Sequence, residues 1–366
     1  MPISDHVSAN IRAIAPYQPG KPISELAREM GLAADEIIKL ASNENPLGPS
    51  PRALAAIERC LGEIALYPDG NGFALKAALA RHLGVDMAQI VLGNGSNDVL
   101  ELIARLLLGP DRSAVYAQHA FAVYPLATQA CGARGIEAPA SDHGHDLEAM
   151  LRAIAPDTRL VFIANPNNPT GTLLQPDALY AFLRRVSPEV AVVLDEAYVE
   201  YLDPGERAPS IEWLSEFPNL IVTRTFSKAY GLAGLRVGYA LANAELADLM
   251  NRLRQPFNVN SLALAAAEAA LDDADFIAEA KRVNDAGLAQ LAEGFCRLGL
   301  DFIPSAGNFV CVRVGPAQAV FQALLRKGII VRPVANYGLP EHLRVSVGTE
   351  AQNARFLTAL AEVMKA

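Results

Sequence analysis

The residues best suited to chemistry in this chain are two hydroxyls, a lysine and an arginine that follow one apolar run. Thr225, Ser227, Lys228 and Arg236 come shortly after Leu220-Ile-Val, which is typical of a buried strand. A lysine amine can form a Schiff base with an aldehyde, and hydroxyls beside a guanidinium can bind a phosphate. These residue types therefore predict a site for a phosphorylated aldehyde such as pyridoxal phosphate, although a lysine taken alone is usually a solvated surface residue.

Polar residues also follow three other apolar runs of the chain. They form the segments Gly93-Asn-Gly-Ser-Asn97, Asn165-Pro-Asn-Asn-Pro-Thr-Gly171 and Asp195-Glu-Ala-Tyr198. In open α/β sheets, ligands bind outside the carboxyl ends of the strands. We therefore expect the four segments to converge on one edge of a sheet, and this convergence carries more weight than any single motif.

Each of these segments has a plain structural alternative. The Gly93 to Asn97 segment suits a phosphate at a helix N-terminus, but it also fits an ordinary turn, and it lacks the third glycine of a dinucleotide fingerprint. Asp195 suits an anion that pairs with a protonated pyridine nitrogen, or a helix cap. Tyr198 suits a hydrogen bond to the same ligand, or core packing. The prolines after Asn165 fix a turn that can direct its side chain.

Alternating helical and strand patterns must position these segments. Short β-branched runs between helices predict a large doubly wound, mostly parallel sheet of the α/β class, with residues 235–241 as an added antiparallel strand. After Gln255-Pro256, Ala-rich helices and further strands indicate a smaller α+β domain. We therefore expect an N-terminal arm at 1–32, a large domain at 33–255 and a small domain at 256–366.

The composition argues against several classes of function. A net charge of −9 without a Lys/Arg run argues against a nucleic-acid partner. Residues 113–133 lack charged side chains, but their polar residues and Pro125 favour a strand, turn and helix over a membrane span. The four cysteines have no CxxC spacing, and residues 141–146 offer too few ligands for a metal. We expect a cytoplasmic protein without a signal peptide or metal site.

The assembled motifs resemble those of the histidinol-phosphate aminotransferases, a branch of the fold-type-I pyridoxal-phosphate-dependent aminotransferases. The likeness covers nearly the whole chain. Asn43-Glu-Asn-Pro46 and Phe257-Asn-Val-Asn260 point to this branch, whereas several other segments belong to the whole superfamily. The remaining segments of the likeness are Tyr67-Pro-Asp69, Asn165 to Gly171, Asp195 to Tyr201, Ser227 to Arg236 and Leu343-Arg-Val-Ser346.

The resemblance implies pyridoxal 5'-phosphate as cofactor and a role for each matching residue. Lys228 would carry the Schiff base and move the substrate proton, and Asp195 would pair with the pyridine nitrogen. Tyr198 and Asn165 would bind the phenolic oxygen, and Phe121 would stack on the ring, with Tyr124 as the competing candidate. The phosphate would be held by Ser96, Asn97, Thr225, Ser227 and Arg236, together with Tyr67 from the neighbouring subunit of a homodimer.

Substrate contacts are also implied by the resemblance. Arg344 would bind the anionic end of both substrates, because a guanidinium accepts a phosphate or a carboxylate in a fork. Arg332, Tyr17 and Asn45 are further candidates, and a surface strand arginine is the alternative for Arg332.

The implied reaction is transamination between L-histidinol phosphate and 2-oxoglutarate in histidine biosynthesis. An aromatic amino-acid aminotransferase is a close alternative, and a decarboxylase of a phosphorylated amino acid is a weaker one. A pyridoxal-phosphate-sensing regulator would need a DNA-binding segment, and the arm is short and not basic. The function is therefore expected to be enzymatic.

Overall fold

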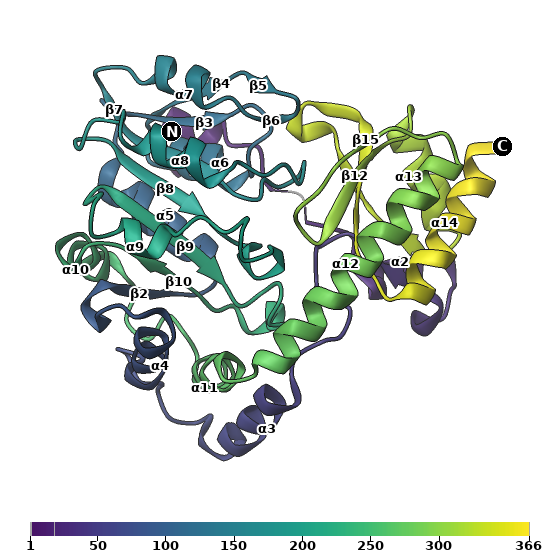
Figure 1. Cartoon of the computed structure of the whole chain (residues 1–366), viewed down its shortest axis with the longest axis horizontal. Coiled ribbons are helices and arrows are strands. Elements are labelled where there is room, and N and C mark those ends of the chain that lie inside the picture. Colours follow the sequence, from purple (N-terminus) through teal and green to yellow (C-terminus); the bar gives the residue numbers. More distant parts are fainter. Residues whose placement is uncertain (1, 18, 366) are drawn as a thin grey trace.

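The computed structural model describes residues 2–17 and 19–365. A large sheet and a smaller sheet lie side by side, each with its own helices (Figure 1). The large sheet has seven strands in the order β2-β10-β9-β8-β7-β3-β4. In that order they are β2 (Ile90–Gly93), β10 (Gly238–Leu241), β9 (Leu220–Thr225), β8 (Ala191–Asp195), β7 (Thr158–Ala164), β3 (Ser113–Ala117) and β4 (Arg134–Ala138).

The large sheet is parallel except for β10, which runs antiparallel to both of its neighbours. This confirms the added antiparallel strand that the sequence predicts. Strands β2 and β8 are buried along their whole length, because helices cover the sheet. Because β2, β7, β8 and β9 run in the same direction, all four end at the same edge of the sheet.

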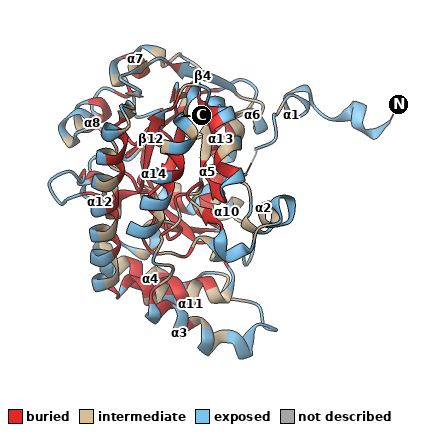
Figure 2. Cartoon of the chain, turned by 90° about the vertical axis from the view of Figure 1, so that its right-hand side faces the viewer, coloured by how far each residue is buried: buried red, intermediate tan, exposed pale blue. Residues whose placement is uncertain are grey.

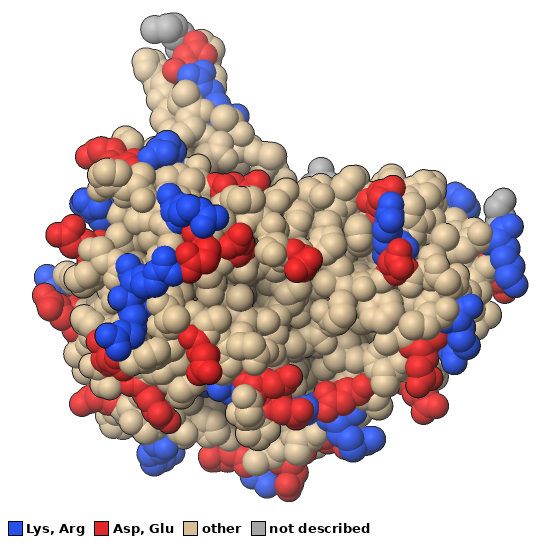
Figure 3. All heavy atoms as spheres, turned by 45° about the horizontal axis from the view of Figure 1, so that its top comes forward, with Lys and Arg blue, Asp and Glu red and all other residues tan. Residues whose placement is uncertain are grey.

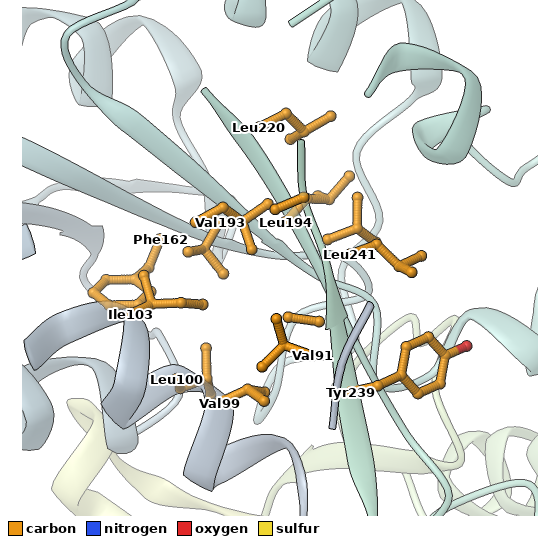
Figure 4. Packing of buried hydrophobic residues seen from close by; sticks show 14 of the residues in the cluster. Val91, Val99, Leu100, Ile103, Phe162, Val193, Leu194, Leu220, Tyr239 and Leu241 are labelled. Carbon is orange, nitrogen blue, oxygen red and sulfur yellow. The ribbon is translucent and has the colours of Figure 1, made fainter. Parts of the chain in front are cut away.

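Helices on both sides of the large sheet bury its faces. In the view of Figure 1, α8 (Pro176–Leu183) lies in front of the sheet and α5 (Ser96–Leu107) behind it. Val99, Leu100 and Ile103 of α5 pack against Val91 and Phe162 of the strands (Figure 4). The other helices around this sheet are α6 (Val123–Ala130), α7 (Leu147–Ala153), α9 (Ser210–Trp213) and α10 (Ala244–Leu253), and the hairpin β5 (Ala140–Ser141) and β6 (Gly144–His145) adjoins β4 in the chain.

The smaller sheet is antiparallel and has the order β11-β12-β15-β14. Its strands are β11 (Phe302–Ile303), β12 (Phe309–Arg313), β15 (Leu339–Ser346) and β14 (Arg332–Val334). Helices α12 (Ala274–Arg297), α13 (Ala317–Arg326) and α14 (Glu350–Lys365) pack on it around a second core that includes Leu291, Phe295 and Phe356. This core is separate from that of the large sheet.

The segment that enters the fold from the N-terminus is attached to the smaller sheet. Helix α2 (Ile23–Met30) fully buries Leu26 beside Leu325 and Ile330. Strand β1 (Ile38–Lys39) then pairs in parallel with β13 (Ile329–Ile330). The residues that follow β1 therefore start at the boundary between the two sheets.

Near the N-terminus, η1 (Ile3–His6) projects from the body (Figure 2), and α1 (Ala9–Arg12) contacts α6 through hydrogen bonds between Asn10 and Gln129. Neither helix has a buried residue (Figure 2). On the face drawn in Figure 3, Lys and Arg lie among Asp and Glu rather than in one basic patch. Within the described residues, no helix combines the length and the apolar character that a membrane crossing requires.

Helix α11 (Ser261–Leu271) packs against α3 (Pro51–Cys60) and α4 (Phe73–Leu83). Its buried residues, which include Ala263 and Ala267, belong to the core of the large sheet. The residues directly after Pro256 thus contact the large sheet's core, although the sequence pattern placed them in the small domain. The remaining short helices are η2 (Ala34–Glu36), η3 (Leu61–Glu63), η4 (Met87–Gln89), η5 (Val199–Tyr201), η6 (Ala233–Leu235) and η7 (Ala335–Tyr337).

Candidate active site

A cavity lies where the carboxyl ends of the large sheet's strands face the smaller sheet. Most of the residues predicted for the site line it. They are Tyr17, Ser96, Asn97, Phe121, Asp195, Tyr198, Thr225, Ser227, Lys228, Arg236, Arg332 and Arg344. The convergence predicted from the strand ends is therefore present, and two arginines from the smaller sheet complete the cavity.

Lys228 is held in a tight turn just after β9. Its Nζ donates a hydrogen bond to the carbonyl oxygen of Ser42 at 3.0 Å, and its side chain is only partly exposed. Burial above all, together with the cations of Arg344 and Arg236, lowers the pKa of Lys228 to about 7, and Glu44 opposes this shift. A substantial share of this amine is therefore neutral near pH 7, which a nucleophile or a base requires.

The turn that carries Lys228 depends on a glycine. Gly231 has φ of +69°, and a Cβ at this position would lie 2.1 Å from the carbonyl oxygen of Gly48. Only glycine fits such a conformation without moving the neighbouring backbone. Asn45 supports the same turn, because its Nδ2 donates to the carbonyl oxygen of Ala229 at 2.7 Å.

Asp195 is a buried carboxylate at the end of β8 that also lines the cavity. Its Oδ2 accepts a hydrogen bond from the Tyr124 hydroxyl at 2.8 Å, and its Oδ1 accepts one from Thr223 at 3.0 Å. Burial raises the pKa of Asp195 more than these two hydrogen bonds lower it, so the pKa is raised to about 6. The carboxylate can therefore bind a cationic N–H from the cavity.

Tyr198 presents a phenol to the same cavity. Its oxygen accepts a hydrogen bond from Nδ2 of Asn43 at 2.9 Å, and burial raises the pKa of Tyr198 to about 12. Asn43 is itself fixed by Ser346 of β15, whose hydroxyl donates to the Asn43 Oδ1 at 2.9 Å. A neutral Tyr198 keeps its own O–H as a donor toward a ligand oxygen.

An anion cradle forms at the N-terminus of α5. It comprises the backbone around Gly95 together with Ser96, Asn97, Thr225, Ser227 and Arg236. Nη1 of Arg236 donates to the Ser227 hydroxyl at 3.2 Å, and the first turn of α5 has no side-chain cap. Free backbone N–H groups, hydroxyls and a guanidinium thus meet at one end of the cavity.

Two glycines leave the space that this cradle needs. A Cβ on Gly95, whose φ is +83°, would lie 2.3 Å from Nη2 of Arg236, and a Cβ on Gly238 would lie 2.5 Å from the backbone nitrogen of Ser96. A side chain at either position would fill the cradle. The donor set, the open backbone, Lys228 and the buried Asp195 together fit pyridoxal phosphate.

Phe121 and Tyr124 have different surroundings, which separates the two stacking candidates. Tyr124 is fully buried, and its ring stacks on Phe162 with centroids 4.6 Å apart. Phe121 lines the cavity, is less buried, and meets Tyr124 edge to face at 5.8 Å. Phe162 thus occupies one face of Tyr124, and although both aromatic residues line the cavity, Phe121 is the more exposed of the two.

Arg344 lies at the far side of the cavity on β15. Its Nη1 donates to Oδ1 of Asn168 and its Nη2 to the carbonyl oxygen of Ala41 at 2.7 Å. Its Nε is buried and has no hydrogen-bond partner among the described residues. The guanidinium of Arg332 lies over the Tyr17 ring at 5.6 Å, so these two candidates adjoin each other.

Three of the predicted site residues lie outside this cavity in the described chain. The Asn165 side chain lies outside the cavity, because its amide bonds to the backbone of Leu174. Its Nδ2 donates to the Leu174 carbonyl oxygen, and its Oδ1 accepts from the Leu174 N–H. Asn45 is likewise used by the turn beside Lys228. Tyr67 is 83% exposed and stacks on Phe257 at 4.8 Å.

Sequence reasoning missed several residues that the structure brings to the cavity. Asn168 lines it in place of Asn165, and Asn43 holds Tyr198. The turn repeats Asn-Pro and so contains two candidate amides, Asn165 and Asn168. The sequence pattern favoured Asn165, which does not line the cavity. Asn43 lies in the Asn-Glu-Asn-Pro segment of the family resemblance, but the resemblance points to Asn45 of that segment as the site residue.

Comparisons with known proteins find relatives over nearly the whole chain. Residues 35–360 match the family model described as aminotransferase class I and II. Histidinol-phosphate aminotransferase 1 of Thiobacillus denitrificans is 64% identical over 357 residues, covering 98% of this chain and 93% of that protein. Histidinol-phosphate aminotransferase 1 of Dechloromonas aromatica is 60% identical and is covered in full, as is this chain.

A solved structure is similar over the same extent. The crystal structure of histidinol-phosphate aminotransferase from Sinorhizobium meliloti in complex with pyridoxal-5'-phosphate has a TM-score of 0.90 and 32% identity, covering 98% of this chain and 97% of that one. The predicted fold class is thereby confirmed. The chain belongs to the class I and II aminotransferases and, within them, to the histidinol-phosphate aminotransferase family.

Proposed function

We propose that this protein transfers the amino group of L-histidinol phosphate to 2-oxoglutarate with pyridoxal phosphate as cofactor, giving imidazole acetol phosphate and L-glutamate. The observation that carries the proposal is one cavity that joins a low-pKa lysine, a buried carboxylate, an anion cradle and a guanidinium. The related proteins named above, at 60–64% identity, carry the same activity in their names.

Different residues would hold the different polar groups of the cofactor. The anion cradle would take the phosphate, Asp195 the ring nitrogen, and Tyr198 with Asn168 the phenolic oxygen, while Phe121 would cover the ring. When bound, the cofactor supplies an electron sink for the substrate carbon that loses its proton. Asn168 replaces Asn165 in this proposal, because Leu174 occupies the Asn165 amide.

Lys228 would act as both attachment point and base. Its neutral amine can take a proton from the substrate carbon and can give that proton back at a later step of the transamination. The nearby cations of Arg344 and Arg236 favour that neutral form. The hydrogen bond to the Ser42 carbonyl oxygen orients the Lys228 amine within the cavity.

Arg344 would bind the anionic end that each of the two substrates carries. Histidinol phosphate ends in a phosphate and glutamate in a carboxylate, and a guanidinium can bind either. The Nε of Arg344 is buried and has no hydrogen-bond partner among the described residues, so the guanidinium keeps one unsatisfied donor. Arg332 and Tyr17, stacked beside it, would contact the substrate phosphate.

A half-reaction titration tests the substrate assignment. Histidinol phosphate, glutamate and phenylalanine are added separately to the holoenzyme, and the cofactor absorbance is followed. We expect histidinol phosphate to convert it with the highest efficiency. A preference for phenylalanine by about tenfold or more, or 1.4 kcal/mol in transition-state binding, would favour the aromatic aminotransferase. Release of carbon dioxide without need for 2-oxoglutarate would favour the decarboxylase.

We further propose that the active unit is a homodimer in which Tyr67 reaches the neighbouring cavity. Tyr67 lies outside the cavity of its own chain. The segment around it exposes a run of large apolar side chains that a second copy would cover. They are Leu54, Leu61, Ile64, Leu66, Tyr67, Phe73 and Phe257.

Subunit complementation tests this arrangement. The Tyr67→Ala and Lys228→Ala variants are each expected to lose activity. A mixed dimer contains one site with both residues intact only if Tyr67 acts across the interface, so mixing should restore about a quarter of wild-type activity. No restoration, or an unimpaired Tyr67→Ala enzyme, would contradict the proposal.

The domain limits and the location of the protein belong to the same proposal. We place the start of the small domain within α12, because α11 packs with the large core and the later part of α12 with the small one. The arm at 1–32 would pack on the small domain through α2 and on the partner subunit through its projecting start. Four free cysteines support a cytoplasmic location.

A further inference from the structure

We propose that Tyr124, together with Thr223, is a positioning residue that fixes the Asp195 carboxylate toward the cavity and keeps it ionised. The inference rests on the proposed function, in which Asp195 pairs with the cofactor ring. Tyr124 comes from α6 and Thr223 from β9, so neither lies near Asp195 in the chain. Sequence reasoning considered Tyr124 only as a stacking residue.

The hydrogen bonds define the orientation of the carboxylate. Tyr124 donates to one oxygen of Asp195 at 2.8 Å, and Thr223 donates to the other at 3.0 Å. Rotation of the carboxyl group would break both contacts within a buried region, where unsatisfied oxygens are costly. Each oxygen still has a lone pair, so the pair of donors leaves room for an N–H from the cavity.

Tyr124 is itself rigidly held. Its ring stacks on Phe162 with an interplanar angle of 5°, and Phe121 meets it edge to face. Burial, the Asp195 charge and the hydrogen bond raise the pKa of Tyr124 well above its usual value, so the phenol keeps its proton and donates. One residue thereby links the carboxylate to Phe121, the proposed cover of the cofactor ring.

Electrostatics give this contact a second role. Burial alone favours protonated Asp195, and the neighbouring Glu196 adds to that effect. The hydroxyls of Tyr124 and Thr223 and the backbone N–H of Ala197 act in the opposite direction and stabilise the anion. Removing the Tyr124 hydroxyl should therefore leave a larger neutral fraction of Asp195 at neutral pH.

The test compares Tyr124→Phe with Thr223→Val and with a control, Tyr116→Phe. Phenylalanine keeps the stacking on Phe162 and removes only the donor. Tyr116 lies on β3 of the same sheet, where its charged neighbour is Glu137 rather than Asp195. Each variant is also made in an Asp195→Ala background.

Two readouts are measured. The first is the protonation midpoint of Asp195 in the cofactor-free protein, followed as the infrared carbonyl band that Asp195→Ala removes. The second is the dissociation constant for pyridoxal phosphate at several pH values. We expect Tyr124→Phe to raise the midpoint and to weaken binding about tenfold or more, as expected for a hydrogen bond to a charged group. Tyr116→Phe should change neither.

The Asp195→Ala background decides whether Tyr124 acts through Asp195. There, Tyr124→Phe should have no further effect on cofactor affinity. An equal loss in both backgrounds, or an unchanged Asp195 midpoint, would overturn the inference. If the protein bound no pyridoxal phosphate, the proposed function would fail, but the infrared midpoint would still judge the role of Tyr124.

Discussion

The lowered pKa of Lys228 gives a prediction that needs no substrate. At pH 8, an amine with a pKa of about 7 is about 90% neutral, whereas an ordinary lysine amine with a pKa of 10.5 is about 0.3% neutral. In the cofactor-free protein at pH 8, the neutral and reactive fraction of Lys228 should therefore be about 300-fold larger than that of an ordinary lysine. Its labelling should follow a midpoint near pH 7.

The assay is competitive acetylation with a trace of acetic anhydride, with the Lys228 peptide quantified by mass spectrometry at each pH. The neighbouring charges supply matched variants. Arg344→Gln removes a cation and should raise the labelling midpoint, whereas Glu44→Gln removes an anion and should lower it. A wild-type midpoint of 10 or above, or shifts of the opposite sign, would refute the electrostatic reasoning.

The same amine should make folding depend on pH. The folded form releases the Lys228 proton near pH 7 and the unfolded form near 10.5, so the unfolded state binds more protons between these values. The stability of the cofactor-free protein should therefore rise with pH across that window, by at most about 5 kcal/mol from this group. Lys228→Met should lose this rise, as measured by chemical denaturation at several pH values.

Two further predictions concern stability. Gly231→Ala should destabilise the fold by about 2 kcal/mol or more, since φ is +69° and the new Cβ would meet the Gly48 carbonyl; Gly205→Ala, in open space, should change the melting temperature little. Burial raises the pKa of Glu200 to about 7, and its Oε2 has no hydrogen-bond partner among the described residues. This group should make the wild type lose stability as pH rises from 4.5 to 7, and Glu200→Gln should remove that loss in denaturant titrations; an identical pH dependence would contradict it.

The strand ends could be predicted from the sequence because buried parallel strands leave uninterrupted apolar runs. Asp195 ends such a run and Lys228 follows one within three residues, so their place in the cavity needed only the general geometry of an α/β sheet. The antiparallel β10 agrees with the prediction, and among the described residues the connection from β9 holds only the short η6 and no α-helix that could form a parallel crossover.

The choice between neighbouring amides could not be made in the same way. Asn165 and Asn168 belong to one turn, and the backbone of Leu174 decides which of them faces the cavity. Tyr124 reaches Asp195 across 71 residues of sequence, and no local pattern marks that contact. These placements depend on tertiary packing, which periodicity and spacing do not encode.

The segment after β1 bonds to residues that lie 303 positions further along the chain. Ala41 accepts from Arg344, and Asn43 bonds with Ser346. A growing chain on the ribosome can therefore build the large sheet long before these partners exist. Until β15 has been made, Asn43 lacks its Ser346 contacts and the cavity lacks one wall. Contacts to a substrate through Arg344 can therefore form only when synthesis is nearly complete, whereas the anion cradle, Asp195 and Lys228 are made much earlier.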